Sequence, residues 1–237
     1  ADTTELLEHQ HVTVEDKQIV EVSDVSPKLR DAQRFDLNGR IMIPGLIDAH
    51  AHVCLPDYNL TALRAMQPSR MFAEAVVSLE KMLLRGFTTI RDAAGADRGL
   101  AQAVENGVIV GPRIYPSGHA LSPTGGHGDH RFHVEESPLC GCGSALEFAF
   151  RTFDGVPEVL QGVRDEIRRG SSQIKVMASG GVTSVNDPID SVQFSPEELS
   201  AITSEAARWG KYVMAHVYSP EAIKHAVDCG VRSRDHC

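Results

Sequence analysis

A repeated unit constrains the fold of this chain most: an amphipathic helix ends at a glycine, and a short apolar strand follows within a few residues. The unit occurs at Gly86 before residues 87–92, Gly170 before 174–177, Gly210 before 212–216 and Gly230 before 231–233. Glycine adopts the left-handed backbone with which many helices end. Strands that alternate with helices over short links predict a parallel sheet, because parallel neighbours need a crossover between them.

Either a doubly wound sheet or a (β/α)8 TIM barrel has this alternation. Side chains that could build a site lie in or directly after several different strands, at His50, His52, Lys175, His216 and His236. A doubly wound sheet binds its ligand at one crevice, whereas a barrel collects site residues from the carboxyl ends of many strands. We therefore predict an α/β fold in which residues 46–237 form strands 1–6 of a (β/α)8 TIM barrel, incomplete because eight strands are needed to close it.

The first 45 residues have a different sequence pattern, without the alternation of helices and strands. Residues 11–15 and 18–22 are rich in strand-forming side chains on either side of the turn-like pair Asp16 and Lys17. This pattern is typical of a β-hairpin. We expect residues 1–45 to form part of a small β-sandwich, separate from the barrel.

Two helices have clear signals of their own. Residues 71–84 carry apolar side chains three and four positions apart, which predicts one buried face. Ser195 followed by Pro196 is typical of a helix start, with serine as the cap and proline in the first turn. Both helices fit the alternating pattern.

The composition is that of an ordinary globular protein, 42% hydrophobic and 23% charged over 237 residues. The formal net charge of -9 disfavours nucleic acid and anionic membranes as partners, since both are polyanions. No apolar stretch approaches the roughly 20 residues that cross a bilayer. Five cysteines, an odd number without a disulfide-framework spacing, indicate a reducing compartment, and we expect the cytoplasm.

Two histidines separated by one residue end the first predicted strand of the barrel. Alternate side chains of a strand point the same way, so His50 and His52 share a face. Neutral imidazole nitrogens are common zinc ligands, and two side by side can bind one ion. The alternative is an ordinary pair of surface histidines.

Lys175 lies inside the apolar strand 174–177, where an unpaired ammonium group is costly to bury. Two arrangements would compensate it. One is an acidic partner. The other is a neutral amine that takes up carbon dioxide and forms a carbamate, which can bridge two metal ions.

Five motifs, in order, resemble the amidohydrolase superfamily, in its prolidase-like branch related to imidazolonepropionase. They are PGLIDAHAH at 44–52, RGFTTIRD at 85–92, SPTGGHGD at 122–129, QIKVMASGG at 173–181 and AHVY at 215–218. The resemblance covers nearly the whole chain. It implies a (β/α)8 barrel and a metal-dependent hydrolase.

The resemblance also implies roles for individual residues. Two divalent ions, zinc, would bind with His50 and His52 on one, His216 and His236 on the other, and carboxylated Lys175 between them. His127 would contact the substrate as a catalytic residue, together with Lys175, and Tyr218 would meet the carboxylate end of the substrate. The alternatives are a histidine that orders its loop and an ordinary packed tyrosine.

The reaction implied is hydrolysis of an amide bond by a metal-bridging hydroxide, in dipeptides or N-acyl amino acids with a free carboxylate. A deaminase or a lactone or ester hydrolase could use the same site. A different class is a truncated homologue that binds metal without catalysis. The branch also implies a homo-oligomer with a small-molecule substrate.

Two departures from the family accompany these matches. The relatives take a metal-binding, proton-transferring aspartate from an eighth strand, which this chain does not reach. Asp48 and Asp92 lie at other strands, and Asp235 is expected to point away from its neighbour His236. Arg234 is expected to share the face of His236, which places a cation beside that ligand.

A second pair of candidate ligands, Cys140 and Cys142, lies in the long loop after the third predicted strand. A metal or redox role is one interpretation of this pair. We favour a packed loop.

Overall fold

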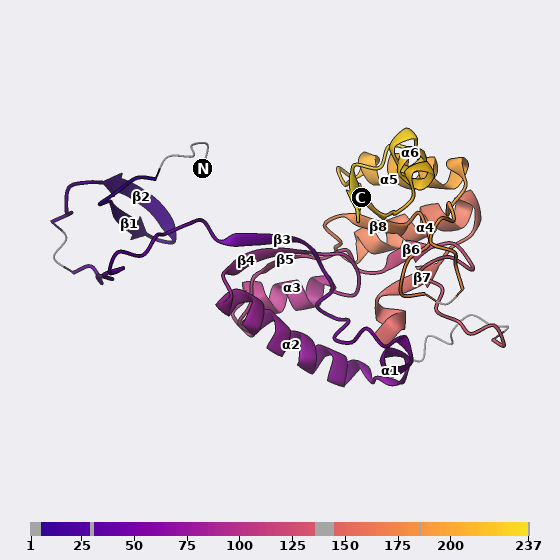
Figure 1. Cartoon of the computed structure of the whole chain (residues 1–237), viewed down its shortest axis with the longest axis horizontal. Coiled ribbons are helices and arrows are strands. Elements are labelled where there is room, and N and C mark those ends of the chain that lie inside the picture. The colour runs from indigo at the N-terminus through magenta and orange to yellow at the C-terminus, as the bar shows by residue number, and fades with distance from the viewer. Residues whose placement is uncertain (1–5, 29–30, 136–144, 185, 237) are drawn as a thin grey trace. The chain divides into compact units, whose positions relative to one another are not determined.

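The computed structural model describes residues 6–28, 31–135, 145–184 and 186–236, in two compact units, Ala1–Pro44 and Gly45–Cys237 (Figure 1). In the first unit, β1 (His11–Glu15) pairs antiparallel with β2 (Gln18–Ser23). Asp16 and Lys17 turn the chain with φ of 48° and 67°, so the predicted hairpin is confirmed. Within the described part of this unit no third strand joins the pair, and the assignment of residues 1–45 to part of a β-sandwich stays a prediction.

The second unit contains two sheets in which every strand pair is parallel. The smaller sheet has the order β3 (Leu46–Ala51), β4 (Phe87–Asp92), β5 (Arg113–Tyr115). The larger has the order β10 (Ser233–Asp235), β9 (Val213–His216), β8 (Ile174–Met177), β6 (Ala120–Ser122), β7 (Phe150–Thr152). The prediction of an α/β fold with parallel strands is confirmed.

A closed barrel is not observed in the described residues. The expected third strand is divided in two, since β5 pairs with β4 whereas β6 pairs with β8. β3 and β10 each have a strand neighbour on one side only. Both sheets are therefore open, and the (β/α)8 barrel stays a prediction.

The helices alternate with the strands as predicted. They are α1 (Leu60–Ala65), α2 (Pro68–Leu84), α3 (Arg98–Glu105), α4 (Gly155–Arg168), α5 (Pro196–Arg208) and α6 (Pro220–Asp228), with a 3-10 turn η1 (Ala145–Phe148). Ser195 caps α5 in a capping box with Glu198. The predicted glycines after helices all have positive φ: Gly86 97°, Gly170 93°, Gly210 66° and Gly230 86°. Among the described helices, none is both long and apolar enough to cross a membrane.

Two apolar cores support the two sheets. The core beside β3 to β5 includes Leu79 of α2, Ile90 of β4 and Leu100 of α3. The core beside β6, β8 and β9 includes Val163 of α4 and Ile202 of α5. The helices thus hold the strands in place, and the carboxyl ends of the strands are left to build a site.

Cys54 follows β3, and its side chain is fully buried. Burial, and then the carboxylates of Asp92 and Asp97, raise the pKa of its thiol well above its usual range. A thiol reacts as its thiolate, so we expect iodoacetamide at about pH 9 to leave Cys54 unmodified in the folded protein. Mass spectrometry of the proteolytic peptide measures this. The same treatment in denaturant is the control and should alkylate Cys54, and equal alkylation without denaturant would contradict the expectation.

Candidate active site

The histidine pair lies at the carboxyl end of β3, on one face of the strand as predicted. Nε2 of His50 and Nε2 of His52 are 3.1 Å apart, and the ring centroids are 5.0 Å apart. The carboxylate of Asp48 accepts a hydrogen bond from the backbone N–H of His50 at 3.0 Å, which fixes the strand end locally. Two ring nitrogens therefore face one point.

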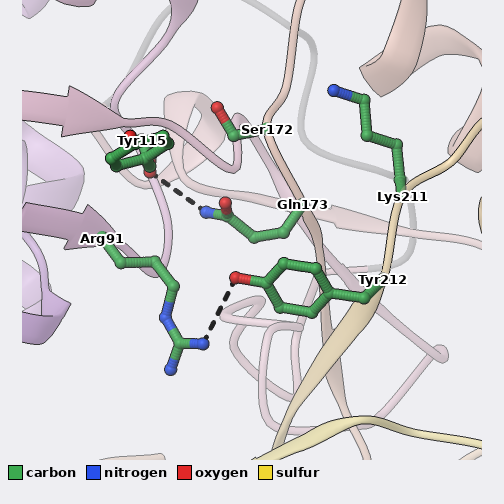
Figure 2. A pocket seen from close by; sticks show the side chains of 6 residues that line it. All are labelled: Arg91, Tyr115, Ser172, Gln173, Lys211 and Tyr212. Atoms are coloured by element: carbon green, nitrogen blue, oxygen red, sulfur yellow. Dashed lines mark hydrogen bonds between the residues drawn. The ribbon is translucent and has the colours of Figure 1, made fainter.

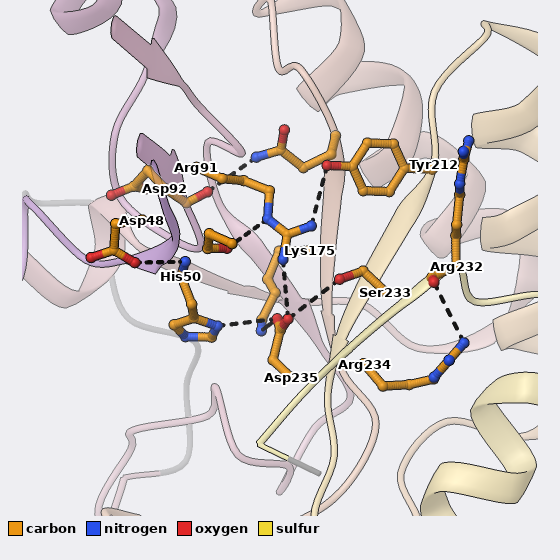
Figure 3. A network of polar contacts seen from close by, with 12 residues as sticks. Asp48, His50, Arg91, Asp92, Lys175, Tyr212, Arg232, Ser233, Arg234 and Asp235 are labelled. Carbon is orange, nitrogen blue, oxygen red and sulfur yellow. Dashed lines mark hydrogen bonds and ion pairs between the residues drawn. The ribbon is translucent and has the colours of Figure 1, made fainter. Parts of the chain in front are cut away.

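Lys175 has the acidic partner that was one of its two predicted arrangements. It is 1% exposed, and its Nζ donates to Oδ2 of Asp235 at 2.8 Å (Figure 3). The same oxygen lies 3.2 Å from Nδ1 of His50. Arg91 contributes a second cation, with Nη2 3.3 Å from Oδ1 of Asp235. One carboxylate of β10 thus joins side chains from β3, β4 and β8.

The orientation predicted for the end of β10 is wrong. Asp235 is buried and points to Lys175, and His236 nevertheless reaches the same cluster, because the strand ends at Asp235 and His236 has a φ of 74°. Side chains alternate only while the backbone stays extended. Arg234 is exposed, and its guanidinium donates to the carbonyls of Val231 and Arg232, so no cation enters the site from this position.

His236 lies among the rings of other predicted site residues. Its ring centroid is 4.6 Å from that of His50 and 4.9 Å from that of His216. The ring of Tyr218 stacks on it at 5.2 Å, and Tyr218 also meets His216 edge-on at 5.0 Å. Strands β3, β9 and β10 therefore bring together residues that are far apart in the sequence.

His127 completes the cluster from the glycine-rich loop after β6. Its ring stacks on that of His216 at 4.1 Å. Its Nδ1 lies 3.0 Å from Oγ of Ser184 and 3.3 Å from Oδ2 of Asp187. The ring also covers Gly181, where an added Cβ would lie 2.2 Å from the imidazole, so only glycine fits below it.

Three imidazoles of the cluster have lowered pKa values, with burial as the main cause. Burial is the largest cause that lowers the pKa of His52 to about 3, of His216 to about 2 and of His236 to about 4, with neighbouring histidines and Lys175 adding to each shift. Burial also lowers the pKa of Lys175, against the charge of Asp235. Metal ions bind neutral imidazole, so these rings need not lose a proton at neutral pH.

The chemistry of these donors fits a divalent ion at the histidine pair. Two ligands of one tetrahedral zinc at about 2.0–2.1 Å lie about 3.3 Å apart, close to the 3.1 Å between Nε2 of His50 and Nε2 of His52. Over the described ranges, no set of three or more His, Cys, Asp or Glu side chains is arranged as a complete ion site. The pair therefore supplies part of a candidate site.

Sequence reasoning missed three residues of this site. Asp235 precedes a predicted ligand, and Arg91 lies within the RGFTTIRD motif, so a signal existed for both. Asp187 follows the motif at 173–181 by six residues and is 8% exposed, and only the folded loop shows that it meets His127. The candidate ligands Cys140 and Cys142 lie outside the described residues.

A pocket of about 420 Å³ lies near the amino-terminal ends of β8 and β9, and it shares Arg91 with the carboxylate cluster (Figure 2). Its lining residues are Arg91, Tyr115, Ser172, Gln173, Lys211 and Tyr212. The amide of Gln173 donates to the carbonyls of Asp92 and Tyr115, both at 3.1 Å, and Nη1 of Arg91 meets the Tyr212 hydroxyl at 3.4 Å. None of the predicted ligands lines this pocket.

Several known proteins are similar to this chain in sequence and in fold. Ochratoxinase of Aspergillus niger is 40% identical over 207 residues, which are 83% of this chain and 43% of that protein. A prolidase structure complexed with N-methylphosphonate-L-proline is 46% identical, with a TM-score of 0.92 over 96% of this chain and 56% of that one. A Xaa-Pro dipeptidase structure with bound methionine in the active site is 27% identical, with a TM-score of 0.78 over 91% and 53%.

The chain thus spans about half the length of these relatives. The part that it spans includes the strand ends that hold the histidine cluster. The family model for the amidohydrolase family matches residues 41–237, which is most of the sequence. The chain belongs to the amidohydrolase family.

Proposed function

We propose that this protein hydrolyses an amide bond in dipeptides or N-acyl amino acids that carry a free carboxylate. The histidine cluster is the observation that supports this most, because His50, His52, His216 and His236 come together from three strands around buried Lys175. The prolidase and Xaa-Pro dipeptidase relatives add support for a carboxylate-terminated substrate. Ochratoxinase supports hydrolysis of small molecules by this fold.

In this proposal His50 and His52 would hold one zinc ion and His216 and His236 a second, with Lys175, as a carbamate, as a further ligand. The ions would supply Lewis acidity and an activated water. Carbamate formation would require the Lys175 ammonium to leave its ion pair with Asp235 and lose a proton. The resulting amine would then form a bond from Nζ to the carbon of carbon dioxide and release a second proton.

The other residues bind the substrate. His127 and Tyr218 lie on either side of His216, with ring centroids 4.1 and 5.0 Å from it. We assign Tyr218 to the substrate carboxylate and His127 to the scissile group. We assign Asp92 no role in this reaction; its carboxylate accepts hydrogen bonds from the backbone N–H groups of Val53, Ala94 and Ala96 at 3.0–3.1 Å.

The ion pair between Lys175 and Asp235 favours a second candidate, a site with one metal ion and an unmodified lysine. A deaminase or a lactone or ester hydrolase could work in this way. Both candidates use the histidine pair. They differ in the number of ions bound and in the bond that is broken.

Metal analysis combined with a substrate library separates the two. We expect two zinc ions per chain and release of amines from carboxylate-terminated amides, with little activity on the matching carboxamides. NMR of protein supplied with carbon-13 bicarbonate should show a carbamate signal that Lys175→Ala removes. One ion per chain, with ammonia release or ester cleavage instead, would reject the proposal in favour of the second candidate.

Asp187 is expected to matter for hydrolysis, because its buried carboxylate faces Nδ1 of His127 and accepts from the amide of Gln193 at 3.1 Å. This arrangement holds a hydrogen on Nδ1 and leaves Nε2 for the substrate. Asp187→Asn should lower kcat/KM by about 10- to 100-fold, since misplaced contact groups cost that much. Asp190→Asn, at an exposed position of the same loop, is the matched control and should change little. Equal rates for the two variants would show that Asp187 only orders the loop.

A further inference from the structure

One carboxylate occupies the centre of the polar network at the end of β10. Asp235 is 7% exposed, and its two carboxylate oxygens contact different side chains. Oδ1 faces Arg91 at 3.3 Å, whereas Oδ2 faces Lys175 at 2.8 Å and Nδ1 of His50 at 3.2 Å (Figure 3). Two cations beside one buried carboxyl group keep it as the carboxylate, which can only accept hydrogen bonds.

That carboxylate determines which nitrogen of His50 carries hydrogen. In a neutral imidazole one nitrogen donates and the other accepts. Oδ2 of Asp235 lies 3.2 Å from Nδ1 of His50 without a hydrogen bond between them. The negative oxygen still favours hydrogen on Nδ1 over a lone pair there, so Nε2 keeps its lone pair. Nε2 is the atom that lies 3.1 Å from Nε2 of His52. The ring is thus set to give a lone pair to an ion between the two histidines.

Arg91 holds the carboxylate from the opposite side. Its Nε donates to the carbonyl of Ala49 at 2.7 Å, and its Nη1 lies 3.4 Å from the Tyr212 hydroxyl. The guanidinium therefore links β3, β10 and the residue before β9. Because Arg91 contacts Oδ1 and not Oδ2, it can keep Asp235 in place even when Lys175 leaves the ion pair.

We propose that Asp235, held by Arg91, is a positioning residue that fixes the tautomer and ring orientation of His50 for metal binding. This inference rests on the proposed metal site and adds a role for residues outside the predicted ligands. Carboxylates that accept from the far nitrogen of a metal-binding histidine typically strengthen metal binding by about 10- to 100-fold.

Zinc affinity, measured by competition with a chromophoric chelator on the intact chain, tests the role of Asp235. Asp235→Asn should weaken zinc binding by about 10- to 100-fold while the number of ions per chain is kept. Arg91→Gln should act in the same direction with a smaller effect, because Asp235 remains. Asp228→Asn is the matched control, since Asp228 is an exposed carboxylate paired with Lys224.

NMR of isotope-labelled histidine supplies a second measurement that needs neither metal nor substrate. We expect the Nδ1–H form of His50 in the parent protein and a mixture of tautomers in Asp235→Asn. If Asp235→Asn fails to fold, Arg91→Gln and the spectrum of the parent protein still decide. Unchanged zinc affinity in both variants would overturn the proposal, and so would loss of a whole ion, which would make Asp235 a direct ligand. Failure of the proposed hydrolysis would leave these binding measurements unaffected, so the two failures are distinguishable.

Discussion

His52→Asn is expected to abolish most metal-dependent hydrolysis, with a loss of about 10³-fold or more in kcat/KM, or about 4 kcal/mol of transition-state stabilisation. The reason is geometric. Nε2 of His52 and Nε2 of His50 are 3.1 Å apart, so they share the position of one ion. Burial lowers the pKa of His52 to about 3, so the ring is neutral at neutral pH. An asparagine cannot reach that position with a lone pair of comparable basicity.

The measurement pairs zinc content with kcat/KM on the amide substrate identified in the library. His11→Asn, at an exposed histidine of β1, is the control and should retain both values. Loss of hydrolysis with full zinc content would place His52 in substrate binding. Full hydrolysis by His52→Asn would remove the histidine pair from the reaction.

Glu166→Gln is expected to destabilise the fold by about 3 kcal/mol, the cost of leaving a buried hydrogen-bond donor without its carboxylate acceptor. Oε1 of Glu166 lies 2.7 Å from Nδ1 of His119, and the two side chains are 2% and 3% exposed. Oε2 accepts from the backbone N–H of His119 at 3.1 Å. The amide of glutamine would turn a donor toward one of these two N–H groups. The Glu166 carboxylate also requires glycine at position 118, because an added Cβ there would lie 2.0 Å from Oε2.

Thermal unfolding measures this effect. A loss of 3 kcal/mol corresponds to a melting temperature lower by roughly 6 to 12 °C in a chain of this size. Asp165→Asn, the neighbouring position of α4 in surface ion pairs with Arg168 and Arg151, is the matched control and should cost less than about 1 kcal/mol. Similar melting temperatures for the two variants would mean that the buried pair contributes nothing specific.

Local signals predicted most of the elements of the fold. Glycines after helices, the Ser195 cap and the Asp16–Lys17 turn act over a few residues, so the sequence alone was sufficient to place them. Closure of the strands is a different matter. Whether β3 pairs with β10 depends on other strands, which the residues of β3 and β10 do not determine. The division of the third predicted strand into β5 and β6 depends on long-range pairing, since β5 pairs with β4 and β6 pairs with β8.

The site shows the same division. The residue types and spacings at His50, His52 and Lys175 predicted a cluster, and the structure brings these side chains together with His216 and His236. The error at β10 arose because alternation was extended one residue too far. A positive φ at His236 cannot be deduced from the strand pattern, and it brings His236 to the same cluster as Asp235.

By itself the sequence determined the parallel alternation of strands and helices and the set of nitrogen donors at the strand ends, because periodicity and residue type are local properties. The tertiary structure alone decided that Asp235 joins Lys175, His50 and Arg91, because that carboxylate lies 60 or more residues from each of them along the chain. The physical reason is burial. A lysine inside a closed apolar layer must find a counter-charge, and only the folded strands determine which carboxylate comes within 3 Å.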